Sequence, residues 1–72
     1  MTHVFTLQAK GLDGLTGCSL RTIESTTCFA TKELAEGRIE KFRATLVANS
    51  MLCEPIEIKI IPHEIIYDYP IN

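Results

Sequence analysis

The stretch that decides the fold runs over residues 3–23 and reads HVFTLQAKGLDGLTGCSLRTI. Its first part alternates apolar and polar side chains, which is the period of a half-buried β-strand. The apolar side chains that share one face are Phe5, Leu7 and Ala9. A second alternation covers residues 18–23, and the dipeptide Asp13-Gly14 between the two is a strong signal for a two-residue hairpin turn. We therefore expect two antiparallel strands joined at this dipeptide.

The turn position also predicts the register of the two strands. Counting outward from the turn pairs Leu12 with Leu15, Ala9 with Cys18, Leu7 with Leu20 and Phe5 with Thr22. Both strands then present apolar side chains on the same face, an agreement that a one-residue slip would destroy. The glycine-rich segment GLDGLTG lacks the Lys-Ser/Thr of a phosphate-binding P-loop. We interpret it as a hairpin tip in which two leucines face each other.

The period changes in the segment TKELAEGRIEKFRATLVAN, residues 31–49. Thr31 is a typical helix N-cap, because its hydroxyl can accept a hydrogen bond from a first-turn backbone N–H. Apolar side chains then recur at helical spacing along one face: Ala35, Ile39, Phe42 and Leu46. The opposite face carries a strip of small residues that would let another backbone approach: Gly37, Ala44 and Ala48. We expect one helix over residues 31–49.

Alternation returns in EPIEIKII, residues 54–61, which predicts a third strand. Pro62 lacks a backbone donor and is expected to end or bend this strand. We favour two strands joined at Pro62-His63, with residues 65–69 as a candidate fourth strand. The resulting fold is a two-layer α+β sandwich of order β-β-α-β(-β), with a mainly antiparallel sheet in the spatial order 2-1-3. The helix is expected to cover one face of the sheet, formed by Phe5, Leu7, Leu20, Ile56, Ile58 and Ile60.

The size and composition indicate one small folded domain over residues 1–72. Hydrophobic residues make up 46% of the chain and aromatic residues 7%, which is unlike the polar composition of disordered segments. A core of this size is often completed by a second copy or by a partner. We therefore expect a protein partner, a homodimer, or both.

The charge disfavours nucleic acid as a partner. Seven Lys and Arg against nine Asp and Glu give a formal net charge of −2, without a run of either sign. Nucleic-acid binding usually requires a basic face that displaces counterions. The alternative function is a small nucleic-acid-binding module that uses the scattered cations on the helix and the sheet edge: Arg21, Lys32, Arg38, Lys41 and Arg43.

The three cysteines are an odd set without C-x-x-C spacing: Cys18, Cys28 and Cys53. The first residues lack the features of a signal peptide, and no stretch approaches the ~20 apolar residues of a membrane span. We expect a cytoplasmic protein whose reduced cysteines serve as small buried hydrophobic residues. His3, His63 and these cysteines lack the spacing of a zinc site. We expect no metal, no cofactor and no catalytic residue.

These observations favour a non-catalytic intracellular protein-interaction module, a small inhibitor or adaptor of the kind that phages and mobile elements encode. Its expected contact surfaces are the leucines of the hairpin tip, the small-residue strip of the helix and the C-terminal tyrosines. Tyrosine is enriched at interfaces because one end of its side chain is apolar and the other forms hydrogen bonds. The candidate partner-binding residues are Leu12, Leu15, Gly37, Ala44, Ala48, Tyr67 and Tyr69.

Overall fold

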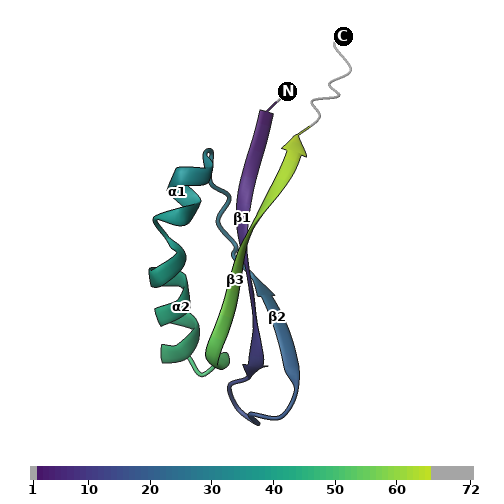
Figure 1. Ribbon diagram of the computed structural model, residues 1–72, viewed down its shortest axis with the longest axis vertical. Coiled ribbons are helices and arrows are strands. Elements are labelled where there is room, and N and C mark those ends of the chain that lie inside the picture. The colour runs from purple at the N-terminus through teal and green to yellow at the C-terminus, as the bar shows by residue number, and fades with distance from the viewer. Residues whose placement is uncertain (1, 66–72) are drawn as a thin grey trace.

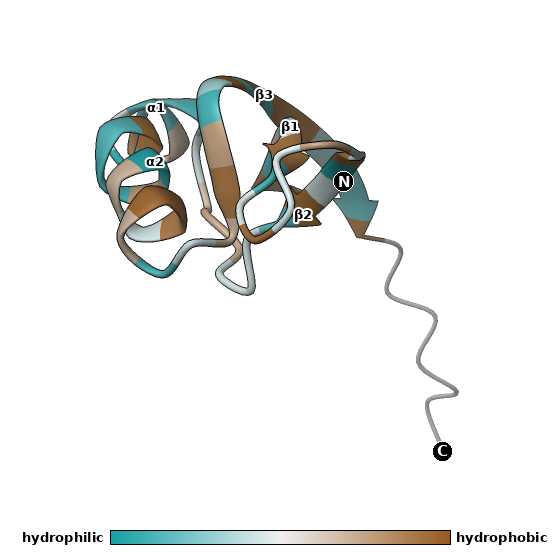
Figure 2. Cartoon of the chain, turned by 90° about the horizontal axis from the view of Figure 1, so that it is seen from below, coloured by the Kyte–Doolittle hydropathy of each residue, from teal (hydrophilic) through white to brown (hydrophobic). Residues whose placement is uncertain are grey.

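The computed structural model describes residues 2–65, which form three strands and two helices (Figure 1). In chain order these are β1 (Thr2–Asp13), β2 (Leu20–Glu24), α1 (Lys32–Glu36), α2 (Ile39–Ala48) and β3 (Leu52–Ile65). The strands form one antiparallel sheet in the order β2-β1-β3, so the expected α+β architecture and strand order are confirmed. Both helices lie on the same side of this sheet, which makes a two-layer fold (Figure 2).

β1 lies in the middle of the sheet, and its side chains alternate between the two faces. Leu7 and Ala9 are 1% and 0% exposed on the face that the helices cover, whereas Lys10 is exposed on the opposite face. The buried core cluster consists of Ala9, Leu46, Leu52 and Ile56, with Ile23, Phe42, Met51 and Ile58 packed against it. The alternation predicted for β1 is therefore confirmed, and it places the core between β1, β3 and α2.

The predicted turn at Asp13-Gly14 and its register are wrong. β1 continues to Asp13, a loop spans residues 14–19, and Leu20 pairs with Leu12 instead of Leu7. The partner of Leu20 therefore shifts by five residues along β1. Because five is an odd number, this shift exchanges the side chains on the two faces of β2. Ile23 therefore lies opposite Ala9 and packs on the core, while Leu20 lies on the uncovered face and is 69% exposed. Leu20 thus does not belong to the face covered by the helices.

A tertiary contact explains why the turn does not occur at Asp13-Gly14. The backbone N–H of Gly14 donates to the carbonyl oxygen of Met51 at 3.1 Å, which extends the pairing of β1 with the start of β3. A Cβ at Gly14 would overlap the carbonyl group of Ser50. Gly14 is therefore required for a close backbone approach to the connection between α2 and β3. The positive φ that the hairpin needs, +68°, belongs to Gly17.

The helical segment begins as predicted but is divided in two. Thr31 is the N-cap, and its hydroxyl accepts a hydrogen bond from the backbone N–H of Leu34 at 3.2 Å. The expected single helix breaks at Gly37 and Arg38, where the backbone N–H of Arg38 donates to the carbonyl of Ala35 at 3.1 Å. This tight i→i+3 bond coincides with glycine, which favours the helix interior less than any residue except proline. Neither helix of residues 2–65 is long and apolar enough to cross a lipid bilayer.

β3 is longer than expected, because it continues through Pro62 to Ile65 as one strand. Phe5 exchanges backbone hydrogen bonds of 2.8 and 2.7 Å with Phe29, which lies on the β2 side of β1. The pair of Phe5 and Pro62 across the sheet is therefore not hydrogen-bonded, and the proline nitrogen faces the open edge of the sheet. A proline at such a position costs the sheet no hydrogen bond.

The expected division into two strands at Pro62-His63 is wrong for this reason. The candidate fourth strand over residues 65–69 is not observed, since Ile65 ends β3 and the remaining residues lie outside the described part of the chain.

Candidate functional site

The hairpin tip, residues 12–20, carries three exposed leucines. Leu15 is 82% exposed in the loop, and Leu12 and Leu20 are 38% and 69% exposed as cross-strand partners on the uncovered face of the sheet. Leu12 and Leu15 are the predicted partner-binding residues of the tip, and the structure places Leu12 near the end of β1 and Leu15 in the loop that follows. The predicted pairing of Leu12 with Leu15 is wrong, because Leu20 occupies that position. The sequence pattern could have assigned Leu20 to the hairpin tip only if the loop were known to span residues 14–19.

The backbone of the tip is held by Asp13. Its carboxylate accepts hydrogen bonds from the backbone N–H of Leu15 at 3.3 Å and from the hydroxyl of Thr16 at 3.2 Å. Its carbonyl oxygen accepts from the N–H of Gly17 at 2.7 Å, and its own N–H donates to Ser19 at 2.7 Å. One residue thus organises most of the loop. Such a loop loses little further conformational entropy when its leucines bind a surface.

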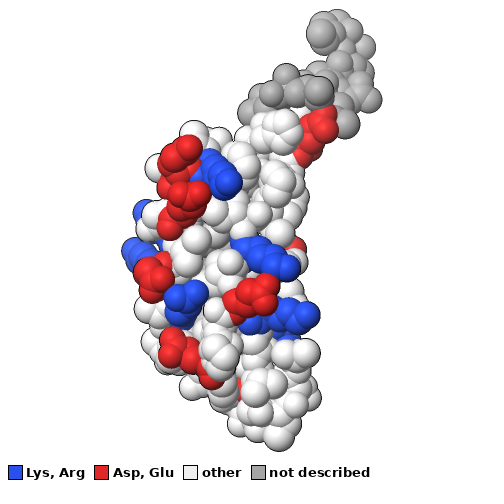
Figure 3. All heavy atoms as spheres, viewed as in Figure 1, with Lys and Arg blue, Asp and Glu red and all other residues white. Residues whose placement is uncertain are grey.

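The tip also differs from the rest of the surface in charge. Among residues 12–20, Asp13 is the only Asp, Glu, Lys or Arg. Its carboxylate lies 3.7 Å from the guanidinium of Arg21. Figure 3 shows Lys, Arg, Asp and Glu mixed along the helices and strands, while the end of the molecule with this loop is mostly uncharged on the face shown. The hairpin tip is therefore an apolar end on a charged molecule.

The other candidate partner-binding residues do not join this surface. Gly37, Ala44 and Ala48 are all exposed, as the helical periodicity predicted. Gly37 lies at the break between α1 and α2, so the small-residue strip does not follow one continuous helix. Tyr67 and Tyr69 lie outside the described residues.

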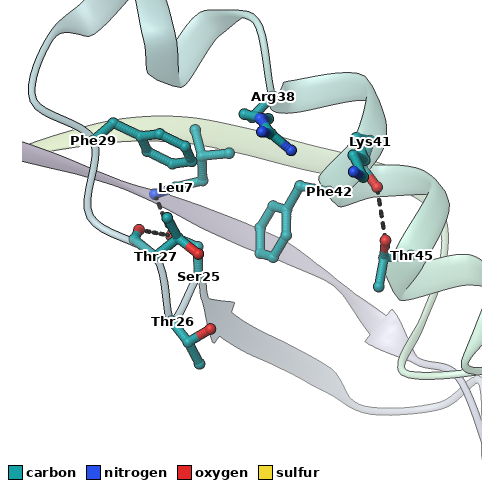
Figure 4. A pocket seen from close by; sticks show the side chains of 9 residues that line it. All are labelled: Leu7, Ser25, Thr26, Thr27, Phe29, Arg38, Lys41, Phe42 and Thr45. Carbon is teal, nitrogen blue, oxygen red and sulfur yellow. Dashed lines mark hydrogen bonds between the residues drawn. The ribbon is translucent and has the colours of Figure 1, made fainter.

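A second feature is a pocket between α2 and the connection from β2 to α1, which we call the cationic pocket. Its volume is about 320 Å³, and its lining residues are Leu7, Ser25, Thr26, Thr27, Phe29, Arg38, Lys41, Phe42 and Thr45 (Figure 4). No sequence pattern indicates this pocket, because residues 25–29 form one wall and residues 38–45 the other, and α1 lies between these two segments in the chain. Arg38 and Lys41, its basic residues, belong to the set of scattered cations in the sequence.

Hydrogen bonds attach one wall of the cationic pocket to β1. The backbone N–H of Ser25 donates to the carbonyl of Leu7 at 2.8 Å, and the Ser25 hydroxyl accepts from the N–H of Leu7 at 3.0 Å. The same hydroxyl donates to the carbonyl of Thr27 at 3.0 Å. Further along, Phe29 is bonded to Phe5. These bonds hold residues 25–29 beside the sheet at a distance from α2 that leaves the pocket open.

The five cations of the alternative nucleic-acid hypothesis have different surroundings. Arg21 lies 3.7 Å from Asp13, and Arg43 lies 3.1 Å from Glu40 and also donates to the carbonyl of Ile56. Arg38 and Lys41 are brought together at the cationic pocket. Lys32 begins α1 and does not line this pocket.

The cysteines and histidines are dispersed. Cys18 and Cys28 are exposed, so the expectation that they are buried is wrong; Cys53 is half-buried, and all three thiols are free. The Nε2 atom of His63 lies 2.8 Å from the hydroxyl oxygen of Thr6. Within residues 2–65, no group of three His, Cys, Asp or Glu side chains could hold a metal ion.

Comparisons of the chain with protein-family models, with curated proteins and with solved structures found no match.

Proposed function

We propose that this chain is a non-catalytic, intracellular protein-interaction module that binds its partner through the hairpin tip. The observation that carries the proposal is the exposure of Leu12, Leu15 and Leu20 at a hairpin tip whose loop is held by the hydrogen bonds of Asp13. Single exposed leucines are common on protein surfaces, but grouped apolar side chains are typical of binding sites. The role fits a small inhibitor or adaptor acting in the cytoplasm, of the kind that phages and mobile elements encode.

The cross-strand pair gives the tip a continuous apolar surface. Leu12 and Leu20 lie directly opposite each other on the face that no helix covers, so their side chains are neighbours. A partner that covers this pair and Leu15 would bury three leucines, and the charged groups next to them, Asp13 and Arg21, already lie 3.7 Å apart. Burial of one leucine side chain is worth about 1.5–3 kcal/mol, so each leucine can change the affinity by roughly 10- to 100-fold.

Site-specific photo-cross-linking in cells tests the proposal. A photoreactive amino acid is placed at Leu15, and in a control protein at Leu34, an exposed leucine (56%) on α1. We expect a discrete cross-linked protein from the Leu15 position and none from the Leu34 position. Cross-linking from neither position, or from Leu34 alone, would contradict the proposal.

The cross-linked protein then serves for affinity measurements. Leu15→Ser should weaken binding by roughly 10-fold or more, whereas Leu34→Ser should leave it unchanged. Both residues are exposed, so both variants should keep the stability of the parent within about 0.5 kcal/mol. If the cross-linked protein is a second copy of the chain, the same two variants show by sedimentation whether the tip forms a homodimer.

A further inference from the structure

We propose that the cationic pocket binds a small molecule that combines a planar aromatic ring with a phosphate group, the chemistry of a nucleoside monophosphate. This site is separate from the hairpin tip and does not depend on the function proposed for it. The tip lies at the far end of β2, and none of the residues 12–20 lines the pocket.

The charges of the pocket point to an anion. Arg38 and Lys41 both line it, and its lining contains no Asp or Glu, although the whole chain carries a net charge of −2. The salt bridges within residues 2–65 involve other cations, namely Arg21, Arg43 and Lys59. Arg38 and Lys41 are therefore both available to pair with a bound phosphate.

The apolar lining points to an aromatic ring. Phe29 comes from the connection and Phe42 from α2, and in Figure 4 the ring of Phe42 lies below Arg38 while the ring of Phe29 lies to the left, next to Leu7. Both phenylalanines are only half-buried, so part of each ring faces the pocket. Nucleic-acid bases stack on aromatic side chains, and the guanidinium of Arg38 can stack on a base as well.

The polar groups and the size of the pocket restrict the ligand further. The hydroxyls of Thr26 and Thr27 make none of the hydrogen bonds found within residues 2–65, so both can donate to a phosphate or a sugar. The volume of about 320 Å³ is at the lower end of the range for ligand sites. It suits one nucleotide unit and is small for a dinucleotide cofactor.

The experiment is an NMR titration of the labelled protein with four probes: adenosine 5′-monophosphate, adenosine, ribose 5-phosphate and a short single-stranded oligonucleotide. We expect the monophosphate to shift the ring signals of Phe29 and Phe42 and to bind with a Kd of roughly 0.1–1 mM. Adenosine and ribose 5-phosphate should each bind at least fivefold more weakly, since each lacks one of the two recognised groups. Tighter binding of the oligonucleotide would identify the source of the nucleotide as a single strand.

Charge-neutralising variants test the assignment of the phosphate site. Arg38→Gln and Lys41→Gln should each weaken binding of the monophosphate roughly fivefold. The matched control is Lys10→Gln, which makes the same charge change at an exposed position on the opposite face of the sheet. All three positions are exposed, so folding should be retained, and far-UV circular dichroism checks this.

Three results would overturn the proposal. The first is the absence of shifts at Phe29 and Phe42 up to about 10 mM monophosphate, well above the expected Kd. The second is equal affinity for ribose 5-phosphate and for the monophosphate, which would show that the pocket does not recognise the aromatic ring. The third is an equal loss of affinity in Lys10→Gln and Arg38→Gln, which would show a general effect of charge.

Discussion

Substitution of the half-buried Gly14 by alanine should destabilise the fold far more than the same change at the exposed Gly17 and Gly37. A Cβ at Gly14 would overlap the carbonyl group of Ser50 and lie 2.9 Å from the backbone nitrogen of Leu52. Both neighbours are backbone, so they cannot rotate away as a side chain would. The hairpin must then separate from the connection between α2 and β3.

The expected loss can be estimated from two contributions. Forcing extra volume into a packed contact costs about 1–3 kcal/mol. Separation of the two segments also weakens the 3.1 Å hydrogen bond from the N–H of Gly14 to Met51, which is worth about 1 kcal/mol. We therefore expect Gly14→Ala to lower the free energy of unfolding by about 2–4 kcal/mol. The total free energy of unfolding of a domain of this size is roughly 4–11 kcal/mol, so this loss would be a large fraction of it.

Two other glycines provide matched controls. At Gly17 an added Cβ meets nothing within 4 Å, but φ is +68°, so Gly17→Ala should cost about 1–2 kcal/mol through backbone strain alone. At Gly37 the Cβ would lie 3.6 Å from two carbonyl oxygens, an ordinary contact, and φ is −67°. Gly37→Ala should therefore raise the stability by about 0.5–1 kcal/mol, because alanine favours the helix.

Urea unfolding followed by circular dichroism measures all three variants. The expected order of stability is Gly37→Ala, parent, Gly17→Ala and Gly14→Ala. A Gly14→Ala protein within about 0.5 kcal/mol of the parent would refute the close backbone approach, because surface substitutions without such a contact stay in that range. The loop position and the strand register argued from this contact would then be wrong as well.

Two further substitutions test the core and the wall of the cationic pocket. Leu46→Ala removes a side chain that is 1% exposed and should cost about 2–5 kcal/mol in urea unfolding; a loss below 1 kcal/mol would contradict the packing of α2 on the sheet. Ser25→Ala removes both hydrogen bonds of the Ser25 hydroxyl and leaves the N–H of Leu7 without that partner, which should cost about 1–3 kcal/mol. Faster hydrogen exchange at the amide of Leu7 should accompany this loss, and an unchanged exchange rate would exclude the bond.

The local parts of the fold could be predicted from the sequence because each depends on neighbouring residues. The alternation around Leu7 and Ala9 determines which face of β1 is buried, since side chains on a strand alternate by geometry alone. The N-cap of α1 at Thr31 and the apolar stripe that ends at Leu46 in α2 each depend on residues that are near in the sequence. The pairing of β1 with β2 also follows from their short connection, whereas β3 follows two helices and pairs with β1 on its other side.

The tertiary structure alone decided the features that depend on distant segments. The contact of Gly14 with Ser50 lengthens the hairpin loop, which moves Leu20 from the expected core face to the hairpin tip. Pro62 lies inside a continuous strand because its nitrogen faces the open edge of the sheet. The cationic pocket forms because hydrogen bonds to β1 hold residues 25–29 beside the sheet, opposite α2. Local periodicity shows which side chains share a face, but only packing between distant segments determines which elements meet.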